Sequence, residues 1–330
     1  MNLVQHAARR LDYAKYLCGL RKSVHVYGDG ARPRKISILI PDSAGDVAIN
    51  ASVTRSLKRR HPDTGITLIS HPRYLPVADL NPDYDDACAF PEAYLAAEPS
   101  VWGYRDQIDI AERTSPDMDI LYLCQPSAWC DHIVPKFTML DLQNHLCGIP
   151  PDARLPPKLT LKPEHKTFAE TCISELPRPA IVFARKAFTV QIGGLIDEFW
   201  KSAARLCIDR GMIVLDNATS SVIDHASCIP IGNRSLVELV AIAGKSRGFV
   251  SLRSGASDLV GFATDTPQYA IYPKASYRYS KTSFLDWCSL RSMGVTVATE
   301  VENSFVADAD LELELSRLRD WLDRNLHASE

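Results

Sequence analysis

Residues 36–62 read ISILIPDSAGDVAINASVTRSLKRRHP. The stretch begins with a short apolar run, Ile36–Ile40, which is typical of a buried strand. After the turn PDSAGD, apolar residues recur at i, i+4 spacing at Ile49, Val53 and Leu57, which predicts an amphipathic helix. A strand that leads through a small-residue turn into a helix is the repeating unit of a parallel α/β sheet.

The same alternation continues through the rest of the chain. In the first half, the sequence predicts further short strands at 65–71, 85–91 and 118–125. In the second half, it predicts strands at 179–186, 212–217, 248–255 and 268–273, and helices at 195–211, 235–246 and 256–265. Strands separated by helices indicate parallel sheets with crossover helices, so the predicted fold class is α/β.

The length of the chain and its proline-rich middle stretch predict two α/β domains. A chain of 330 residues exceeds what one compact core usually holds, and a proline-rich stretch with little periodicity separates the two halves. The predicted parts are a basic N-terminal helical extension at 1–35, an α/β domain at 36–150, a proline-rich linker at 151–178, a second α/β domain at 179–310 and a C-terminal helix at 311–330. Ligands bind such sheets at the carboxyl ends of the strands.

The composition is typical of a cytoplasmic globular protein. The formal net charge of −3 does not favour nucleic acid as a partner, and no apolar run reaches the ~18 residues of a membrane span. Arg9, Arg10 and Asp12 interrupt the N-terminus before a signal-peptide core could form. The nine cysteines are scattered and odd in number, which indicates reduced thiols that fill the core.

The basic N-terminal segment has two interpretations. Residues 5–22 carry apolar side chains at helical spacing, and lysine and arginine outnumber aspartate over residues 1–36. Such a helix could make a peripheral contact with the anionic cytoplasmic face of the inner membrane. The alternative, which we favour, is a helix that packs on the protein and leaves its basic face in water.

The turn in the opening stretch is the first candidate site. Ser43 and Gly45 make a small-residue turn that lets a ligand approach the backbone closely. Asp46 follows at the first turn of the predicted helix, where the helix dipole favours an ionised carboxylate. A plain N-cap is the alternative interpretation of this aspartate. The dinucleotide and P-loop glycine fingerprints are absent from the turn.

A second strand–turn–helix unit lies at residues 251–263. Ser254, Gly255 and Ser257 would offer free backbone amides at a helix N-terminus, which is a natural phosphate site. Arg253 adds a planar cation suited to phosphate oxygens, and Asp258 could bind a sugar hydroxyl or cap the helix. The alternative is a small-residue turn with a surface arginine.

A third loop follows the first strand of the second half. Arg185 and Lys186 stand at the carboxyl end of that strand, where they could neutralise a diphosphate, or they could be solvated surface charges. No metal site is expected. The C-x-H and H-x-C pairs at 130–132 and 145–147 do not have usual zinc spacing, and the D-x-D pair at 117–119 precedes its strand, at the wrong end for ligand binding.

Two long stretches resemble a known family. Residues 45–70, with Gly45-Asp46 and a helix that ends before Pro62, resemble the opening of heptosyltransferase-like glycosyltransferases of family 9. Residues 230–273 are similar to the second half of that family in their helix, strand, small-residue turn and Thr-Pro before the last strand. The resemblance covers roughly residues 36–275 and is more specific in the first stretch.

The resemblance implies the GT-B fold, in which two Rossmann-like domains face each other across a cleft. It implies an inverting transferase that uses no metal or other cofactor and takes a sugar from a nucleotide-sugar donor. Asp46 would be the general base on the acceptor side, beside Ser43 and Gly45. The turn at 253–258 would hold the donor diphosphate. Arg185 and Lys186 lie near the place of one donor-contacting motif of the family, and Asn217 lies in the place of another.

This sequence departs from the family pattern in the donor-binding motifs. Where the family has Asp-(Ser/Thr)-Gly-x-x-His, the chain has Arg253 in place of the acidic residue and Asp258 in place of the histidine. The family's Lys-x-Trp-Pro after the first strand of the second domain is missing, and a glycine turn after the next strand has become Asp216-Asn217. The reaction class implied by the fold does not depend on these positions.

The expected chemistry is transfer of a sugar to a surface glycan or glycolipid acceptor of lipopolysaccharide, capsule or glycoprotein type. We expect Asp46 to face residues 254–258 across the cleft and to take the acceptor hydroxyl proton. Two other functions remain open at this point. One is another GT-B-shaped enzyme of surface-polysaccharide synthesis, such as a pyruvyl transferase or epimerase, and the other is a catalytically degenerate binding module.

Overall fold

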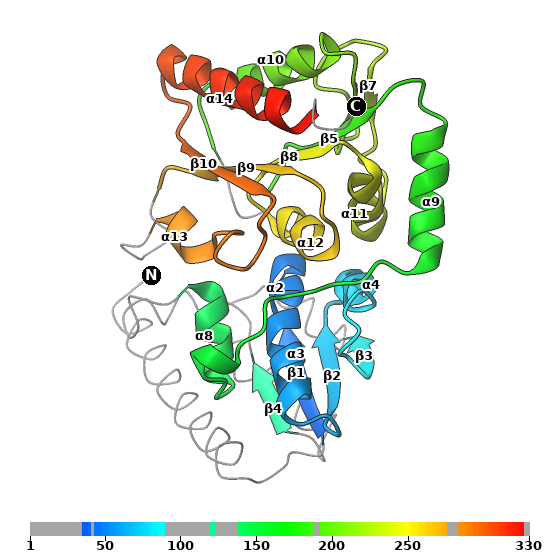
Figure 1. The fold of residues 1–330 in the computed structure, drawn as a ribbon, viewed down its shortest axis with the longest axis vertical. Helices are drawn as coiled ribbons and strands as arrows, with labels where there is room; N and C mark the ends of the chain where they lie inside the picture. The colour runs from blue at the N-terminus through cyan, green and yellow to red at the C-terminus, as the bar shows by residue number, and fades with distance from the viewer. Residues whose placement is uncertain are drawn as a thin grey trace, which may run out of the picture. The chain divides into compact units, whose positions relative to one another are not determined.

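The computed structural model describes residues 35–40, 43–89, 119–122, 138–187, 192–275 and 283–326. They form two compact units, one up to Leu159 and the other from Thr160 onward (Figure 1). The basic N-terminal extension predicted at 1–35 lies outside the described residues except for Lys35. Among the helices described, none is both long enough and apolar enough to cross a bilayer.

The first unit is built on a parallel sheet of four strands in the order β3-β2-β1-β4. β1 pairs with β2 from Lys35 opposite Gly65 to Ile40 opposite Ser70. The strands are β1 (Lys35–Ile40), β2 (Gly65–Ser70), β3 (Asp86–Ala89) and β4 (Asp119–Tyr122), and the helices are α2 (Ala44–Ile49), α3 (Ala51–Arg60), α4 (Leu75–Ala78) and α8 (Met139–Leu146). Short 3₁₀ turns lie at Pro72–Tyr74 and Pro151–Ala153.

The opening stretch folds as predicted, with one break in its helix. Ser43 caps α2, because its hydroxyl oxygen accepts a hydrogen bond from the backbone N–H of Asp46 at 3.1 Å. The helical pattern from Asp46 to Arg60 is divided at Asn50 into α2 and α3, although Asn50 keeps a right-handed helical conformation. Val53 and Leu57 are buried, as their spacing predicts.

The second unit has a parallel sheet of six strands in the order β10-β9-β8-β5-β6-β7. Its strands are β5 (Ala180–Ala184), β6 (Ile213–Asp216), β7 (Cys228–Pro230), β8 (Gly248–Leu252), β9 (Gln268–Pro273) and β10 (Ala298–Asn303). Its helices are α9 (Pro163–Ser174), α10 (Ile196–Ile208), α11 (Leu236–Lys245), α12 (Gly255–Ala263), α13 (Phe284–Cys288) and α14 (Asp308–Leu326). The two units confirm the predicted α/β class and parallel sheets.

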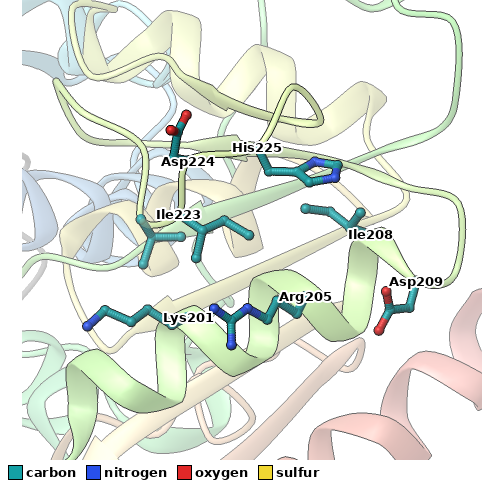
Figure 2. Close-up of a pocket in the computed structure, with 8 residues that line it drawn as sticks. Lys201, Arg205, Ile208, Asp209, Ile223, Asp224 and His225 are labelled. Atoms are coloured by element: carbon teal, nitrogen blue, oxygen red, sulfur yellow. The ribbon is translucent and has the colours of Figure 1, made fainter.

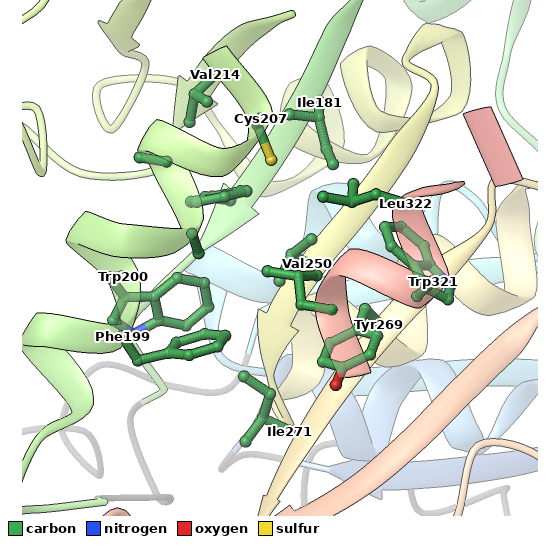
Figure 3. Packing of buried hydrophobic residues seen from close by; sticks show 14 of the residues in the cluster. Ile181, Phe199, Trp200, Cys207, Val214, Val250, Tyr269, Ile271, Trp321 and Leu322 are labelled. Carbon is green, nitrogen blue, oxygen red and sulfur yellow. The ribbon is translucent and has the colours of Figure 1, made fainter. Parts of the chain in front are cut away.

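The main described core of the second unit lies between its sheet and the helices α10 and α14 (Figure 3). Phe199 and Trp200 of α10 stack edge to face, with ring centroids 5.2 Å apart, and Trp321 of α14 packs against Tyr269 of β9. These rings are almost fully buried. They anchor the sheet as a rigid base for the loops at the carboxyl ends of its strands.

The predicted linker needs a correction. The sequence predicts a proline-rich interdomain linker with little periodicity at 151–178, but residues Pro163–Ser174 form α9. This helix packs against α11 and belongs to the second unit, which begins at Thr160. Proline at the first helical position is compatible with a helix start, so Pro163 marks the beginning of α9 rather than a break in structure.

Candidate functional site

The strand order of the second sheet identifies one position at the carboxyl ends of its strands as a candidate ligand site. β5 pairs with β6 on one side and with β8 on the other, so the chain proceeds in opposite directions from β5. Because the crossover segments diverge there, a crevice forms at the carboxyl ends of such a strand pair. Residues after β5 and after β8 therefore line the point where an α/β sheet usually binds its ligand.

The turn after β8 holds a buried ion pair. The guanidinium of Arg253 donates to both carboxylate oxygens of Asp258, with Nη2 to Oδ1 at 2.5 Å and Nη1 to Oδ2 at 2.9 Å. The two side chains are only 4% and 3% exposed. Arg253 also donates to the backbone carbonyls of Cys288 at 3.0 Å and Ser254 at 2.8 Å. Most of its donors are therefore engaged within the protein.

For both Arg253 and Asp258, burial and ion pairing shift the pKa in opposite directions. Burial alone would lower the pKa of Arg253, but the Asp258 carboxylate outweighs it, so the pKa of Arg253 is raised. Burial raises the pKa of Asp258 to about 6, against the attraction of Arg253, which lowers it. The bidentate contact with Arg253 favours the ionised form of Asp258.

Arg253 and Asp258 stand at the two positions of this turn that differ from the motif of the family that the sequence resembles. In this chain the arginine and the aspartate bind each other and close the turn with an internal salt bridge. The expectation that Arg253 offers an open cation to a phosphate is revised, because its charge is already neutralised in a buried pair.

The small residues of this turn have different roles. Ser257 is fully buried, and its hydroxyl bonds with the side chain of Ser251 at 2.9 Å and accepts from the backbone N–H of Ser254 at 3.2 Å. It therefore supports the turn from inside. Ser254 and Gly255 are half-buried, and Gly255 begins the nine-residue helix α12. The first-turn amides of a helix have no partner within it and carry partial positive charge.

The loop after β5 contributes a second ion pair and an exposed cation. Arg185 donates from Nε to Oδ1 of Asp216 at 2.8 Å and from Nη2 to the carbonyl of Ser220 at 3.2 Å. Asp216, the last residue of β6, is fully buried. Lys186 is exposed, and no ion pair with it is found in the part of the chain that the structure describes. Asn217 is half-buried at the end of β6, and its backbone N–H donates to Phe183 at 2.8 Å.

The candidate residues of the first unit lie at the carboxyl end of β1. Asp46 is in the first turn of α2 and is 6% exposed, and Gly45 beside it is buried. The side chain of Ser43 is committed to capping this turn. The N-cap interpretation therefore applies to Ser43, whereas Asp46 places a carboxylate beside the sheet edge where parallel sheets bind ligands.

Asp85, just before β3, has a structural role. Asp85 accepts hydrogen bonds from Nζ of Lys58 at 2.6 Å and from the backbone N–H of Ile66 at 2.7 Å. It lies where β2 begins, at the amino end of the sheet. No group of three metal-binding side chains is found among the described residues. Cys130, His132 and Asp117 lie outside that part of the chain.

Three groups that shape the site were not predicted. Asp216 neutralises Arg185, the carbonyl of Cys288 accepts from Arg253, and the ring of Tyr272 lies under the Arg253 guanidinium at 5.9 Å. A buried aspartate at the end of an apolar run is a signal for a paired cation. The carbonyl of Cys288 carries no sequence signal, because any residue type would present one.

Comparison with known proteins gives a likeness of fold. No protein-family model and no curated protein sequence matches the chain. Among solved structures, the ADP-heptose lipopolysaccharide heptosyltransferase II of Escherichia coli aligns with 88% of this chain and 99% of its own, at 17% identity and a TM-score of 0.62. A family 9 glycosyltransferase of Veillonella parvula aligns with 89% of this chain and 98% of its own, at 11% identity and a TM-score of 0.61.

A third structure is heptosyltransferase WaaC of E. coli with ADP-2-deoxy-2-fluoro heptose. It aligns with 88% of this chain and 99% of its own, at 12% identity and a TM-score of 0.55. At these identities the likeness concerns the fold. It confirms the predicted GT-B type of architecture, with two Rossmann-like units, and the predicted structural resemblance to family 9 heptosyltransferases.

Proposed function

We propose that this protein is an inverting, metal-independent glycosyltransferase. It moves a sugar from a nucleotide-sugar donor to a surface glycan or glycolipid acceptor, of lipopolysaccharide, capsule or glycoprotein type. The observation that carries the proposal is the position of the 253–258 turn, which begins a helix at the topological switch point of the six-stranded sheet. The likeness in fold to enzymes that use ADP-heptose supports the same reaction class.

The acceptor half of the reaction requires a base. A sugar hydroxyl is a very weak acid, so it attacks well only while a carboxylate removes its proton. We assign this role to Asp46, because it lies at the carboxyl end of β1 and in a helix turn that Ser43 caps. Gly45 lets an acceptor approach the backbone of this turn. The small exposed fraction of Asp46 keeps bulk water away from the carboxylate.

The donor half of the reaction requires positive charge for the leaving diphosphate. The first-turn amides of α12, from Gly255 onward, and the exposed ammonium of Lys186 would supply this positive charge. Ser254 and Asn217 line the same strand ends and would bind polar atoms of the donor. No metal is required in this scheme, since fixed dipoles and a lysine supply the charge.

The buried side chains of the turn have a positioning role in this proposal. Arg253, Asp258 and Ser257 hold the first turn of α12 against the sheet through bonds that do not involve the donor. Arg185 is held in the same way by Asp216. Such preorganised amides stabilise developing charge without rearranging during the reaction.

The test is a product assay with a panel of nucleotide sugars and glycan acceptors. A transferase releases nucleoside diphosphate only when an acceptor is present, and it links donor sugar to acceptor. Release of no diphosphate while pyruvate appears on the acceptor would indicate a pyruvyl transferase, and an altered sugar on the intact nucleotide would indicate an epimerase. Nucleotide binding without any turnover would indicate a binding module. Each of these results would overturn the proposal.

A further inference from the structure

A carboxylate on the edge strand β10 accepts hydrogen bonds from two separate parts of the second unit. Oε1 of Glu300 accepts from the hydroxyl of Tyr272 on β9 at 2.5 Å and from the backbone N–H of Leu290 at 2.6 Å. Oε2 accepts from the hydroxyl of Ser289 at 2.8 Å and from the backbone N–H of Arg291 at 3.4 Å. Glu300 therefore fastens the segment that follows α13, residues 289–291, to the sheet.

These contacts determine where the carbonyl of Cys288 lies. Cys288 is the last residue of α13 and immediately precedes the segment that Glu300 holds. Its carbonyl oxygen lies 3.3 Å from the hydroxyl of Tyr272 and accepts from Nε of Arg253 at 3.0 Å. The ring of Tyr272 lies under the Arg253 guanidinium. Tyr272 thus contacts Glu300 with its hydroxyl and Arg253 with its ring.

Arg253 extends this set of contacts to the first turn of α12. Its guanidinium donates to the carbonyl of Ser254, the N-cap of α12, at 2.8 Å, and to both carboxylate oxygens of Asp258 within the first turn. The contacts therefore run without a break from Glu300 on β10 to the turn whose amides the proposed function assigns to the donor diphosphate.

A second tyrosine–glutamate pair stands on the other face of β9. Tyr269 donates to Glu314 of α14, and Nδ2 of Asn303 donates to the other oxygen of that carboxylate at 3.0 Å. Tyr269 and Tyr272 are three residues apart in a strand, so their side chains point to opposite faces of the sheet. Figure 1 shows α12 and α13 on one side of this sheet and α10 and α14 on the other. The two pairs have the same chemistry, but it is the Tyr272 pair that adjoins Arg253.

Both tyrosine hydroxyls are donors at neutral pH. Burial raises the pKa of Tyr269 and of Tyr272, and the neighbouring carboxylates raise it as well, so both side chains keep their protons. Replacement of either tyrosine by phenylalanine therefore removes one donated hydrogen bond from a buried pair and keeps the ring.

We infer that Tyr272 and Glu300 are positioning residues of the proposed donor site. They hold the Cys288 carbonyl where it receives Arg253, and through Arg253 they fix the first turn of α12 for the leaving diphosphate. Neither residue contacts the donor or moves a proton in this scheme. The inference rests on the proposed function, because the ligand whose binding it concerns is the nucleoside diphosphate of the donor.

Calorimetric titration of the full chain with ADP, UDP, GDP and CDP tests the inference. Tyr272→Phe removes the hydroxyl, and Glu300→Gln replaces an acceptor oxygen by an amide group that cannot accept from a backbone N–H. Each variant should weaken binding of the preferred nucleotide about tenfold, because the amides of α12 are no longer held in one position. Thermal unfolding of each variant gives the temperature range in which it is folded, and the titrations are made within that range.

Tyr269→Phe is the matched control for Tyr272→Phe. It removes the same hydroxyl from the opposite face of the same strand, so it should lower the unfolding midpoint but leave nucleotide affinity unchanged. A loss of affinity in Tyr269→Phe as large as that in Tyr272→Phe would indicate a general loss of packing and would overturn the inference.

The role of Arg253 as the link has its own test. Arg253→Lys keeps a cation opposite Asp258 but lacks the separate Nε donor that reaches the Cys288 carbonyl. In this background, Tyr272→Phe should weaken nucleotide binding by less than about a further twofold. If Tyr272→Phe weakens binding by the same factor with Arg253 and with lysine at this position, the tyrosine does not act through Arg253 and the inference is wrong.

A cavity elsewhere on the second unit provides the control for the place of binding. It has a volume of about 530 Å³ and lies between α10 and the loop that joins β6 to β7, with the exposed cations Lys201 and Arg205 on one wall (Figure 2). Lys201→Ala and Arg205→Ala should leave nucleotide binding unchanged. The inference is overturned if these two variants remove the binding while Tyr272→Phe and Glu300→Gln retain wild-type affinity.

Two results distinguish a failure of this inference from a failure of the proposed function. If the wild type binds a nucleotide and Tyr272→Phe and Glu300→Gln bind it equally tightly, the positioning role alone is wrong and the transferase proposal stands. If the wild type binds none of the four nucleotides, the donor site itself is wrong, and the positioning role is wrong with it.

Discussion

The guanidinium of Arg253 and the carboxylate of Asp258 form a bidentate ion pair across the turn that begins α12, and both side chains are almost fully buried. Two charges withdrawn from water in this way are held by each other and by backbone carbonyls. Removal of one partner leaves an uncompensated charge in the interior, whereas removal of both does not. The pair therefore behaves as a single unit in the stability of the turn.

A double-mutant cycle tests this coupling. Arg253→Met and Asp258→Leu should each lower the free energy of unfolding by about 3–5 kcal/mol, because each leaves a buried charge unpaired. The double variant should lose less than either single variant. Urea unfolding of the four proteins measures the three differences.

Exposed arginine Arg319 of α14 provides the control for this cycle, since Arg319→Met should change the free energy of unfolding by less than about 0.5 kcal/mol. Additive losses in the double variant would show that Arg253 and Asp258 act separately, and the account of the turn as one electrostatic unit would be wrong.

Lys186 should contribute to nucleotide binding without contributing to folding. In the proposed function its exposed ammonium meets the donor diphosphate, so Lys186→Ala should weaken binding of a nucleoside diphosphate about tenfold. The unfolding midpoint should not change. Titration of the wild type and variant with ADP and UDP measures the effect, with Lys166→Ala as the matched lysine on α9. If Lys186→Ala binds the preferred nucleotide as tightly as the wild type does, the lysine does not contact the donor.

The neighbouring Arg185 should behave differently from Lys186. Arg185→Ala leaves the fully buried carboxylate of Asp216 without its cation, so the main effect should be a lower free energy of unfolding, by about 3–5 kcal/mol. Urea unfolding of the Arg185→Ala and Lys186→Ala variants distinguishes the roles of the two residues. A variant of Arg185 that keeps full stability would contradict the structural role of this pair.

The first unit contains an acid-sensitive contact at Asp85. Burial raises the pKa of Asp85. The hydrogen bonds from Lys58 and from the backbone N–H of Ile66 together lower it by more than burial raises it, so the pKa of Asp85 is below its ordinary value. A lowered pKa in the folded state adds stability above the unfolded value of about 3.9, and this stability is lost as the pH falls through the folded value. The carboxylate is half exposed, so the contribution is at most about 1 kcal/mol.

Asp85→Asn measures this contribution. The wild type should be more stable than the variant at neutral pH, and the difference should shrink as the pH falls below about 4. Urea unfolding curves at a series of pH values give the comparison. If the difference in the free energy of unfolding grows as the pH falls, the pKa of Asp85 is raised in the folded state and this prediction is wrong.

Hydrophobic periodicity was sufficient to predict most of the architecture. The buried strands β1, β2, β5, β8 and β9 are apolar on both faces, as expected of parallel strands, so their runs are visible in the sequence. β10 was not predicted, because this edge strand reads ATEVEN and is polar at most positions. α9 was missed because the surrounding prolines concealed a helix with a weakly amphipathic pattern.

The strand ends and turns that carry the candidate residues were predictable from the sequence, but the hydrogen bonds and ion pairs of their side chains were not. Strand ends followed by small residues marked the turns at Asp46 and Arg253, since parallel sheets place their loops at one edge. The sequence could not show that Arg253 is neutralised by Asp258, five residues later, or that Arg185 is neutralised by Asp216 on the next strand. Both facts depend on side-chain direction and strand register, which a residue pattern does not contain.

The central claim is that Asp46 is the general base of a sugar transfer, and Asp46→Asn tests it most directly. With the preferred nucleotide sugar and acceptor, the variant should lose transfer by at least about a hundredfold while its nucleotide affinity is unchanged. Asp63→Asn, an exposed aspartate between α3 and β2, should transfer like the wild type. A folded Asp46→Asn variant that transfers sugar at the wild-type rate would contradict the account.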